Sequence, residues 1–290
     1  MTGQLVWLVT GCSSGLGEAF VRAILSKGDK VIATARASKG ISGTDRLANL
    51  KEAGAAVLEL DVTAPQAELN EIAKEAWTIY GRIDVLVNNA GYIQGGTLEE
   101  ISEEILTNVL RANALGPLNL TRAILPFMRA RRSGTLLFVG SVSVYYSSLG
   151  ASCYIGSKSL LDGLVPNLAL EAAAFGLRTS ILTFGHFRTD ILGPGNVQYE
   201  LPNPVPEYAE LRKQVEETCN AGTTQFPGDP KKACELVVDA VRGEGRCAGK
   251  ELPLRLPIGS ETFGIMRSNC QERLKACDEW EGIMSDTNWE

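Results

Sequence analysis

Short apolar runs of strand length alternate with longer amphipathic segments along most of the chain. The apolar runs lie at residues 5–10, 30–35, 56–60, 85–88, 135–139 and 178–183. Segments with helical periodicity separate them, near residues 16–27, 43–53, 65–80, 99–130 and 154–175. Buried strands that alternate with helices are typical of a parallel sheet covered on both faces. The pattern therefore predicts an α/β fold, a doubly wound parallel sheet.

The alternation breaks after Thr189. Prolines at 194, 202, 204 and 206 interrupt an apolar and aromatic stretch before a helix resumes near residues 229–242. Loops of this length are commonly lids over active sites, and the aromatic residues Tyr199, Tyr208 and Phe226 favour that interpretation. We expect a mobile lid at about residues 190–227, in which the prolines limit regular helix and sheet.

A last strand at residues 252–256 and a helix at residues 260–280 follow the lid. We place both in a C-terminal strand-helix unit at about residues 250–282. The chain shows no internal repeat and no low-complexity segment. We therefore predict a single domain over residues 1–290 that includes the lid and this unit.

Composition and charge narrow the class of protein. Of the 290 residues, 44% are hydrophobic and 21% are charged, and the net charge is −6. No basic run is longer than residues 129–132, which argues against nucleic acid or an anionic membrane as the main partner. The seven cysteines are scattered without a Cys-x-x-Cys pair, so we expect neither a zinc site nor a disulfide framework. No uncharged apolar run reaches about 18 residues, so we expect a cytoplasmic protein without a membrane span or signal peptide.

The stretch Tyr154-Ile-Gly-Ser-Lys158 opens the helical segment at 154–175. Residues four apart share one face of a helix and lie about 6 Å apart along its axis. An ammonium beneath a phenol favours the ionised phenol and so lowers a pKa that is ordinarily about 10. Tyr154 would then be a usable acid at neutral pH. The alternative is an exposed pair without a chemical role, because this spacing alone is not specific.

A glycine-rich turn, Thr10-Gly-Cys-Ser-Ser-Gly-Leu-Gly17, follows the first strand and opens the first helix. Glycines in this setting allow a tight turn and close approach of the backbone to a pyrophosphate, whose charge meets the helix N-terminus. A structural turn without a ligand is the alternative. Asp61 and Val62 end the third strand, where they can meet an adenine edge, although Asp61 is equally interpretable as a helix N-cap.

The stretch Asn88-Asn-Ala-Gly91 ends the fourth strand. Carboxyl ends of parallel strands share one edge of the sheet, so we expect these motifs to meet at one crevice. Arg36 follows the second strand, where proteins that prefer NAD usually carry Asp or Glu. A guanidinium can instead bind the 2′-phosphate of NADP(H), and Ser13 can add a hydroxyl contact. We predict NADP(H); a solvated Arg36 at a strand end is the alternative.

Five motifs in this order and spacing resemble the ordinary short-chain dehydrogenase/reductase family. They are Thr10-Gly-x3-Gly-x-Gly17, Asn88-Asn-Ala-Gly91, Asn113, Ser141 and Tyr154-x3-Lys158, and the resemblance spans about residues 5–190. It implies a Rossmann-type sheet, a nicotinamide cofactor and a catalytic tetrad of Asn113, Ser141, Tyr154 and Lys158. Residues 31–36 and 252–259 resemble members that act on hydroxysteroids, retinoids and other bulky ketones. Two departures are Phe184-Gly185, where the family usually has Pro-Gly, and Gly140-Ser141, where it often has two serines.

The resemblance also implies roles for these residues. In the reducing direction Ser141 would donate a hydrogen bond to the carbonyl oxygen and Tyr154 would deliver a proton. Lys158 would lower the tyrosine pKa and hold the nicotinamide ribose, and Asn113 would position a water. No metal is expected. The implied cofactor-binding residues are Gly11, Ser13, Ser14, Gly15, Leu16, Gly17, Arg36, Asp61, Val62, Asn88, Ala90, Gly91, Tyr154, Lys158, Gly185, Phe187 and Thr189.

These motifs predict an NADP(H)-dependent oxidoreductase that interconverts a ketone and a secondary alcohol on a bulky apolar substrate. The alternatives are a redox-neutral epimerisation or cyclisation with bound cofactor, or a nucleotide-sensing regulator without turnover. By resemblance, the helices at 99–130 and 154–175 would pair subunits into a homodimer or homotetramer. His186 can touch the substrate or cofactor, but an ordinary loop histidine is the favoured interpretation. Tyr145 and Tyr146 lie where a substrate loop is expected, and aromatic packing is the alternative.

Overall fold

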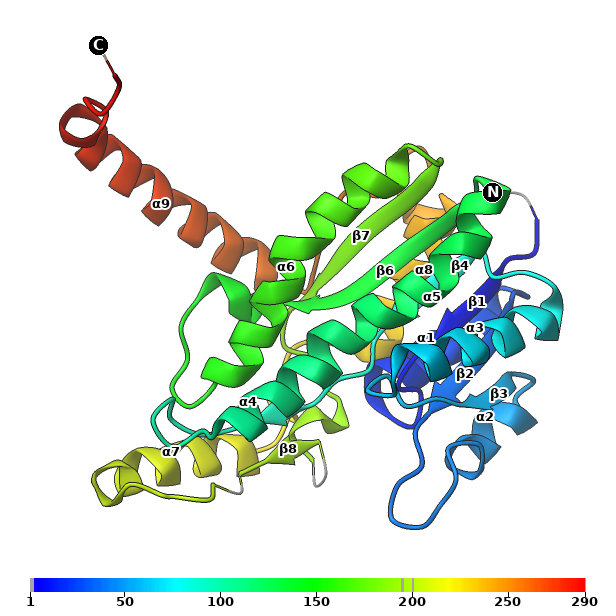
Figure 1. Cartoon of the computed structure of the whole chain (residues 1–290), viewed down its shortest axis with the longest axis horizontal. Helices are drawn as coiled ribbons and strands as arrows, with labels where there is room; N and C mark the ends of the chain where they lie inside the picture. Colours follow the sequence, from blue (N-terminus) through cyan, green and yellow to red (C-terminus); the bar gives the residue numbers. More distant parts are fainter. Residues whose placement is uncertain (1–2, 194–195, 200, 290) are drawn as a thin grey trace.

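Within residues 3–193, 196–199 and 201–289, which the computed structural model describes, seven parallel strands form one central sheet (Figure 1). Their order across the sheet is β3-β2-β1-β4-β6-β7-β9. The strands are β1 (Val6–Val9), β2 (Lys30–Ala35), β3 (Ala56–Glu59), β4 (Val85–Asn88), β6 (Gly134–Ser141), β7 (Leu177–Phe184) and β9 (Arg255–Ile258). The order reverses at β1, which pairs with both β2 and β4. The doubly wound sheet predicted from the alternating pattern is therefore confirmed.

Helices cover both faces of this sheet because successive strand residues point to opposite sides. Trp7 and Val9 of β1 pack with α1 (Gly15–Ser26), α2 (Ala48–Glu52) and α8 (Pro230–Arg242). Leu8 packs on the other side with α3 (Gln66–Tyr80), α5 (Gly116–Arg131) and α6 (Ser152–Ala173). The near-continuous apolar strands of the sequence are thus explained by two cores, one on each face.

The helical segment predicted at 99–130 contains a break. It consists of α4 (Glu103–Leu110), a π-helical turn (Arg111–Leu115) and α5. In this turn the N–H of Gly116 bonds to the carbonyl of Arg111, five residues earlier. Pro117 lacks the N–H that an α-helix would direct at the carbonyl of Asn113, so the regular pattern cannot continue there. A Cβ atom on Gly116 would lie only 2.6 Å from the carbonyl oxygen of Val62, so this turn packs directly on the loop after β3.

The segment predicted as a lid contains more regular structure than its prolines suggested. Strand β8 (Val197–Gln198) pairs with β5 (Ile93–Gln94), and α7 (Ala209–Asn220) follows Pro206. Pro206 lies in the first turn of a short 3₁₀ helix that precedes α7, a position where its missing N–H costs nothing. The prolines therefore limit regular structure less than expected, since α7 and β8 both form between or after them. Pro194 lies outside the described residues.

A buried carboxylate joins the lid segment to the body. The Glu100 side chain is fully buried, accepts a hydrogen bond from the backbone N–H of Val205 at 2.9 Å and pairs with Arg212 of α7. The Tyr208 hydroxyl donates to Glu99 at 2.8 Å. The lid is thus anchored on one side to the loop before α4.

The last strand begins three residues later than predicted, at Arg255 rather than at residue 252. Arg255 pairs in register with Ile181 of β7, and its guanidinium binds Asp162 of α6 at 2.9 Å. As the edge strand of the sheet, β9 accommodates Pro257, which has no N–H to donate. Helix α9 (Thr262–Met284) then projects from the body, as the red helix in Figure 1 shows. No helix among the described residues is long and apolar enough to cross a bilayer.

Candidate active site

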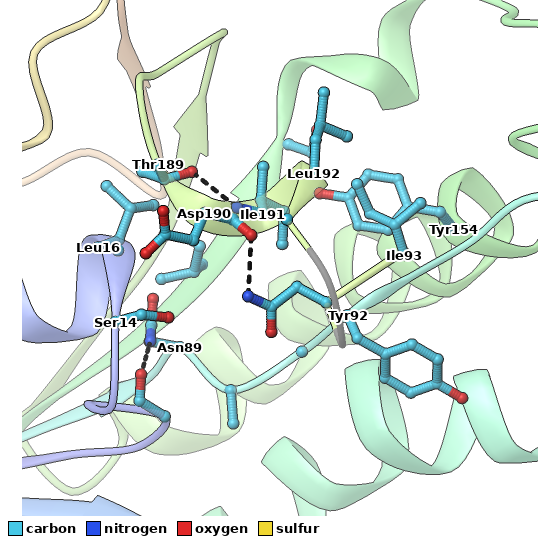
Figure 2. A pocket seen from close by; sticks show the side chains of 18 of the residues that line it. Ser14, Leu16, Asn89, Tyr92, Ile93, Tyr154, Thr189, Asp190, Ile191 and Leu192 are labelled. Carbon is cyan, nitrogen blue, oxygen red and sulfur yellow. Dashed lines mark hydrogen bonds between the residues drawn. The ribbon is translucent and has the colours of Figure 1, made fainter. Parts of the chain in front are cut away.

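A large pocket of about 920 Å³ lies along the carboxyl ends of the central strands. It is lined by the loops that follow β1, β2, β4, β6 and β7 and by the start of α6. Figure 2 shows Ser14 and Asn89 on one side, Tyr154 on the other, and the turn at residues 189–192 between them. The predicted convergence of the motifs at one crevice is what the parallel sheet produces.

The glycine-rich turn forms a narrow cradle at one end of this pocket. Gly11 and Gly15 have positive φ angles of 69° and 59°, which favour glycine. A Cβ atom on Gly17 would overlap the carbonyl oxygen of Gly11. Side chains at these three positions would fill or distort the cradle at the N-terminus of α1. The open backbone therefore fits a pyrophosphate group, as the sequence predicted.

Asn89 and Thr10 hold this cradle to the end of β4. The Thr10 hydroxyl accepts hydrogen bonds from the N–H groups of Asn89 at 2.9 Å and Ala90 at 3.0 Å. The Asn89 amide donates to the carbonyls of Thr10 at 2.8 Å and Gly11 at 3.1 Å. Asn89 lines the pocket, although the prediction named its neighbour Asn88 instead.

Asn88 requires a correction. Its side chain is buried and donates to the hydroxyl of Thr121 on α5 at 3.1 Å, away from the pocket lining. Adjacent residues of a strand point to opposite faces, so only one of the two asparagines can face the crevice. The N-cap interpretation of Asp61 was also wrong: its carboxylate accepts from the N–H and hydroxyl of Thr63, at 2.8 and 2.7 Å, and α3 starts after Pro65. Asp61 does line the pocket.

Two guanidinium groups lie at the rim of the pocket beyond β2. Arg36 is exposed there, as predicted. Arg46, which the sequence analysis missed, donates to the carbonyl of Arg36 at 2.8 Å and to the hydroxyl of Ser13 at 3.0 Å. The sequence does show a basic residue, Arg46, in the helical segment that follows Arg36. The loop conformation that brings the Arg46 side chain back to Ser13 could not be predicted from it.

Ser141, Ser143 and Tyr154 form a chain of hydroxyl groups facing the pocket. The Ser143 hydroxyl donates to the Ser141 hydroxyl at 2.8 Å, and Ser141 in turn hydrogen-bonds the Tyr154 phenol. Lys158 lies one turn along α6, with its Nζ 5.9 Å from the centroid of the Tyr154 ring. The structure therefore brings Ser141, Tyr154 and Lys158 together with Ser143 beside them, and the Asn113 amide donates to Ser157, the neighbour of Lys158, at 3.0 Å.

The protonation of this cluster differs from the prediction. Burial raises the pKa of Tyr154, and the hydrogen bond from Ser141 opposes that rise only in part. The Lys158 ammonium donates to the carbonyl of Val139 at 2.8 Å. Burial lowers the pKa of Lys158 to about 8. Desolvation thus sets the direction of the Tyr154 shift in this arrangement, and the expectation that Lys158 lowers the tyrosine pKa stays a prediction.

The buried Lys158 gives a stability prediction. Its pKa falls from 10.5 in the unfolded chain to about 8 in the fold, so the unfolded state binds this proton more strongly. Lys158 thus destabilises the fold fully below pH 8, and the cost disappears as pH rises from 8 to 10.5. We expect Lys158→Met to raise the free energy of unfolding at pH 7 by about 1–3 kcal/mol, after loss of the Val139 hydrogen bond.

Urea unfolding of both proteins at pH 7 and pH 10 measures this difference. Lys74→Met, which changes an exposed lysine of α3, is the matched control and should have little effect. A stability gain that is the same at both pH values, or a loss at pH 7, would contradict the burial argument.

Asn113 lies in the π-helical turn and is fully buried. Its amide oxygen accepts from the N–H of Tyr92 at 3.0 Å, and its NH₂ group donates to the carbonyl of Tyr92 at 2.8 Å and to Ser157 at 3.0 Å. These contacts fix the loop after β4 against α6. The role of positioning a water stays a prediction, as does the contact of Lys158 with a ribose.

The loop after β7 carries the departure from the usual Pro-Gly. Phe184 is buried and packs edge-on against Phe187 at 5.3 Å between ring centroids. Gly185 has no space for a side chain, because a Cβ atom would overlap the carboxylate of Glu261. Gly185, Phe187 and Thr189 line the pocket, as predicted. The phenylalanine that replaces the usual proline therefore packs in the core, and the loop after it still lines the pocket.

Comparisons with known proteins agree with this geometry. The short chain dehydrogenase family profile matches residues 5–199. Oxidoreductase BOA17 of Botryotinia fuckeliana is 31% identical over 94% of this chain and 95% of its own length. A short-chain dehydrogenase of Streptomyces avermitilis is 34% identical and has a TM-score of 0.84 over 99% of this chain and 100% of its own.

A variant of actinorhodin polyketide ketoreductase, solved with NADPH, is 25% identical and has a TM-score of 0.70 over 89% of this chain and 97% of its own. Another structure of this fold was solved with NAD. The family profile covers well over half of the chain. The chain therefore belongs to the short-chain dehydrogenase family and is an oxidoreductase of that family.

Proposed function

We propose that the protein is an NADP(H)-dependent oxidoreductase that interconverts a ketone and a secondary alcohol on a bulky, largely apolar substrate. The observation that carries this proposal is the Tyr154 phenol, hydrogen-bonded to Ser141 and facing the same pocket as the glycine cradle. A proton donor beside a nucleotide cradle is the arrangement that carbonyl reduction needs. A nucleotide sensor without turnover would have no use for the Ser143–Ser141–Tyr154 chain.

Different residues of the pocket would bind the cofactor and transfer the proton. The glycine cradle at residues 11–17 would hold the pyrophosphate, and Asp61 and Val62 would border the adenine. The nicotinamide, when bound, supplies or accepts the hydride. Ser141 orients the substrate oxygen, and Tyr154 gives a proton to it during reduction. The raised pKa keeps Tyr154 protonated at neutral pH, which suits a proton donor.

The proposed preference for NADP(H) is supported by Arg36 and Arg46 at the rim of the pocket. Both guanidiniums are positively charged, and a 2′-phosphate is the part of NADP(H) that distinguishes it from NAD(H). Ser13 adds a hydroxyl between them and the cradle. The family as a whole does not decide the question, because neighbouring structures hold NADPH in one case and NAD in another.

The substrate half of the pocket is bordered by the lid segment. The turn at residues 190–193 is pinned by Asn196, which donates to the Asp190 carbonyl at 2.8 Å, and Thr223 donates to the Thr189 carbonyl at 2.7 Å. Val215 and Thr218 of α7 also line the pocket. We propose that this segment closes over the substrate.

Hydrogen exchange should test the closure. Amides of residues 191–226 are expected to gain protection when NADP⁺ and a ketone substrate, a pair that cannot react, are bound together, because bound ligand restricts opening of the lid. Amides of α3, on the far side of the sheet, serve as the internal control. Equal protection of the lid with and without ligands would contradict the closure.

A screen of carbonyl compounds with NADPH, followed by loss of absorbance at the nicotinamide band, tests the proposed function. We expect turnover of aryl and polycyclic ketones, with NADPH preferred over NADH. A product with no change in nicotinamide redox state would favour the alternative of epimerisation or cyclisation. No turnover of any ketone, despite tight cofactor binding, would favour a sensor. Cytoplasmic location and pairing of α4, α5 and α6 between two or four subunits remain predictions.

A further inference from the structure

Three neighbouring strands bring a second group of polar side chains to the pocket. Tyr146 follows β6, His186 follows β7 and Glu261 follows β9, and these strands are adjacent in the sheet. Ser141 pairs in register with Phe184, and Phe184 with Ile258, so the three loops begin at the same level. Tyr146 and His186 both line the pocket that contains Tyr154. Glu261 lies outside the stretch that the family profile covers.

The three side chains form a continuous row of polar contacts. The Glu261 carboxylate accepts from the backbone N–H of His186 at 2.5 Å, and the same oxygen lies 3.3 Å from Nδ1 of the ring. At the other end of the ring, Nε2 lies 3.1 Å from the Tyr146 hydroxyl. An ionised carboxylate beside Nδ1 favours a proton on that nitrogen, which leaves Nε2 to accept from the phenol. Glu261 thus positions and polarises the His186 ring.

The charge states agree with this arrangement. Burial acts to raise the pKa of Glu261, but the N–H of His186 and other hydrogen bonds outweigh it and hold the pKa below its ordinary value. Burial, followed by the charge of Glu261, raises the pKa of Tyr146. At neutral pH the Tyr146 phenol at the pocket end of the row is therefore neutral, and the Glu261 carboxylate at the other end is ionised.

An aromatic side chain lies beside this row. Phe226 lies 5.1 Å from the His186 ring between centroids, and Leu149 and Val215 line the same pocket together with the polar Ser148, Gln214 and Thr218. Tyr146 is 37% exposed and the His186 side chain 36% exposed, and both residues line the pocket, so a ligand there can contact them. A substrate that buried their polar groups without satisfying them would lose their hydrogen bonds to water.

We propose that Tyr146 and His186 form a second polar site that hydrogen-bonds an uncharged oxygen of the substrate remote from the reacting carbonyl. The preferred substrate is then a ketone with a further hydroxyl group on an otherwise apolar frame, because that hydroxyl can donate to the Tyr146 oxygen while the Tyr146 O–H donates to Nε2 of His186. This inference rests on the proposed function. Glu261 disfavours a carboxylate on the substrate, because the two negative charges would repel each other. A pocket built to bind a hydroxyl discriminates strongly against an analogue that lacks it.

The alternative is that the row only clamps the chain after β7. The backbone bond from His186 to Glu261 performs that task without the ring or the Tyr146 hydroxyl. His186→Phe keeps this backbone bond and an aromatic ring against Phe226, and Tyr146→Phe removes only a hydroxyl. Tyr145→Phe is the matched control, since Tyr145 interacts with Arg255 and lies outside the pocket lining.

The test compares α-tetralone, a bicyclic ketone, with its positional hydroxy derivatives. For wild type we expect kcat/KM to be at least about tenfold higher for one hydroxy isomer than for α-tetralone. Tyr146→Phe and His186→Phe should each lower kcat/KM for that isomer about tenfold and leave α-tetralone within about twofold. The double variant should lose little more, because both residues serve one hydrogen bond. His186→Gln, whose amide can still accept, should keep part of the preference.

Several outcomes would overturn this inference. If wild type reduces α-tetralone and all its hydroxy isomers equally, or if the variants lose both activities in parallel, the second polar site is absent and the proposed function still stands. If wild type reduces no ketone at all, the proposed function fails and the inference fails with it. Thermal melting of each variant shows whether it is folded. The ratio of kcat/KM for the two ketones is then measured on folded enzyme, so a change in this ratio is not a loss of fold.

Discussion

Tyr154→Phe is expected to lower kcat by about 10²–10⁴-fold, because general acid catalysis by a positioned side chain contributes that much. The substitution removes the phenol hydroxyl and leaves a ring of the same shape in α6. Ser141 and Lys158 keep their other contacts, to Ser143 and to the Val139 carbonyl. The Kd for NADPH should therefore change by less than about threefold. Steady-state kinetics and calorimetric titration with NADPH measure the two quantities separately.

Tyr145→Phe provides the control for this experiment, since it removes a neighbouring hydroxyl outside the pocket lining. It should retain kcat. If Tyr154→Phe kept most of the wild-type rate, Tyr154 would not be the proton donor, and the Ser143–Ser141 hydroxyl chain would have to deliver the proton itself. A large loss of NADPH affinity in Tyr154→Phe would instead indicate a binding role for the hydroxyl.

The fold was predictable because each central strand is a compact apolar run between turn residues. The pattern located β1, β2, β4 and β7 to within a few residues, since burial on both faces demands continuous apolar sequence. It placed β9 three residues too early, because edge position and the Arg255–Asp162 pair matter more there than hydrophobicity. It also failed at α7, because a proline before a helix was read as a proline that prevents one.

The site was predictable at positions where the backbone conformation allows only one residue type. Gly11, Gly15 and Gly17 are examples, because any side chain there would be strained or would collide. Side-chain direction and desolvation were not predictable. Asn88 and Asn89 are chemically identical, and only the strand pleat decides that Asn89 faces the cradle.

The same limitation explains two further differences. The pKa values of Tyr154 and Lys158 depend on how many protein atoms surround them, which spacing along a helix does not encode. The row from Tyr146 to Glu261 joins residues 115 positions apart in the chain, so it becomes visible only when β6, β7 and β9 lie side by side.

Replacement of both Arg36 and Arg46 by alanine is expected to weaken NADPH binding about 100-fold or more and to leave NADH binding nearly unchanged. A charge-assisted hydrogen bond contributes about 1.5–3 kcal/mol, and each 1.4 kcal/mol is about tenfold in Kd. Arg36→Ala alone should cost about tenfold, because the guanidinium of Arg46, held by the Ser13 hydroxyl and the Arg36 carbonyl, remains. Raising the salt concentration should reduce the difference between wild type and variant, as screening weakens charge pairs at an exposed rim.

Calorimetric titration of both cofactors into wild type, the two single variants and the double variant measures these effects without requiring turnover. Arg22→Ala is the matched control, because Arg22 is exposed on α1, pairs with Glu18 at 2.7 Å and lies outside the pocket lining. Arg46→Lys separates two roles for Arg46. A lysine keeps the charge but has one donor nitrogen in place of the two with which Arg46 binds Ser13 and the Arg36 carbonyl, so retained affinity would assign its effect to charge and lost affinity to loop geometry. Equal affinity of wild type for NADPH and NADH, or equal losses of both in the double variant, would show that these arginines do not select the phosphate.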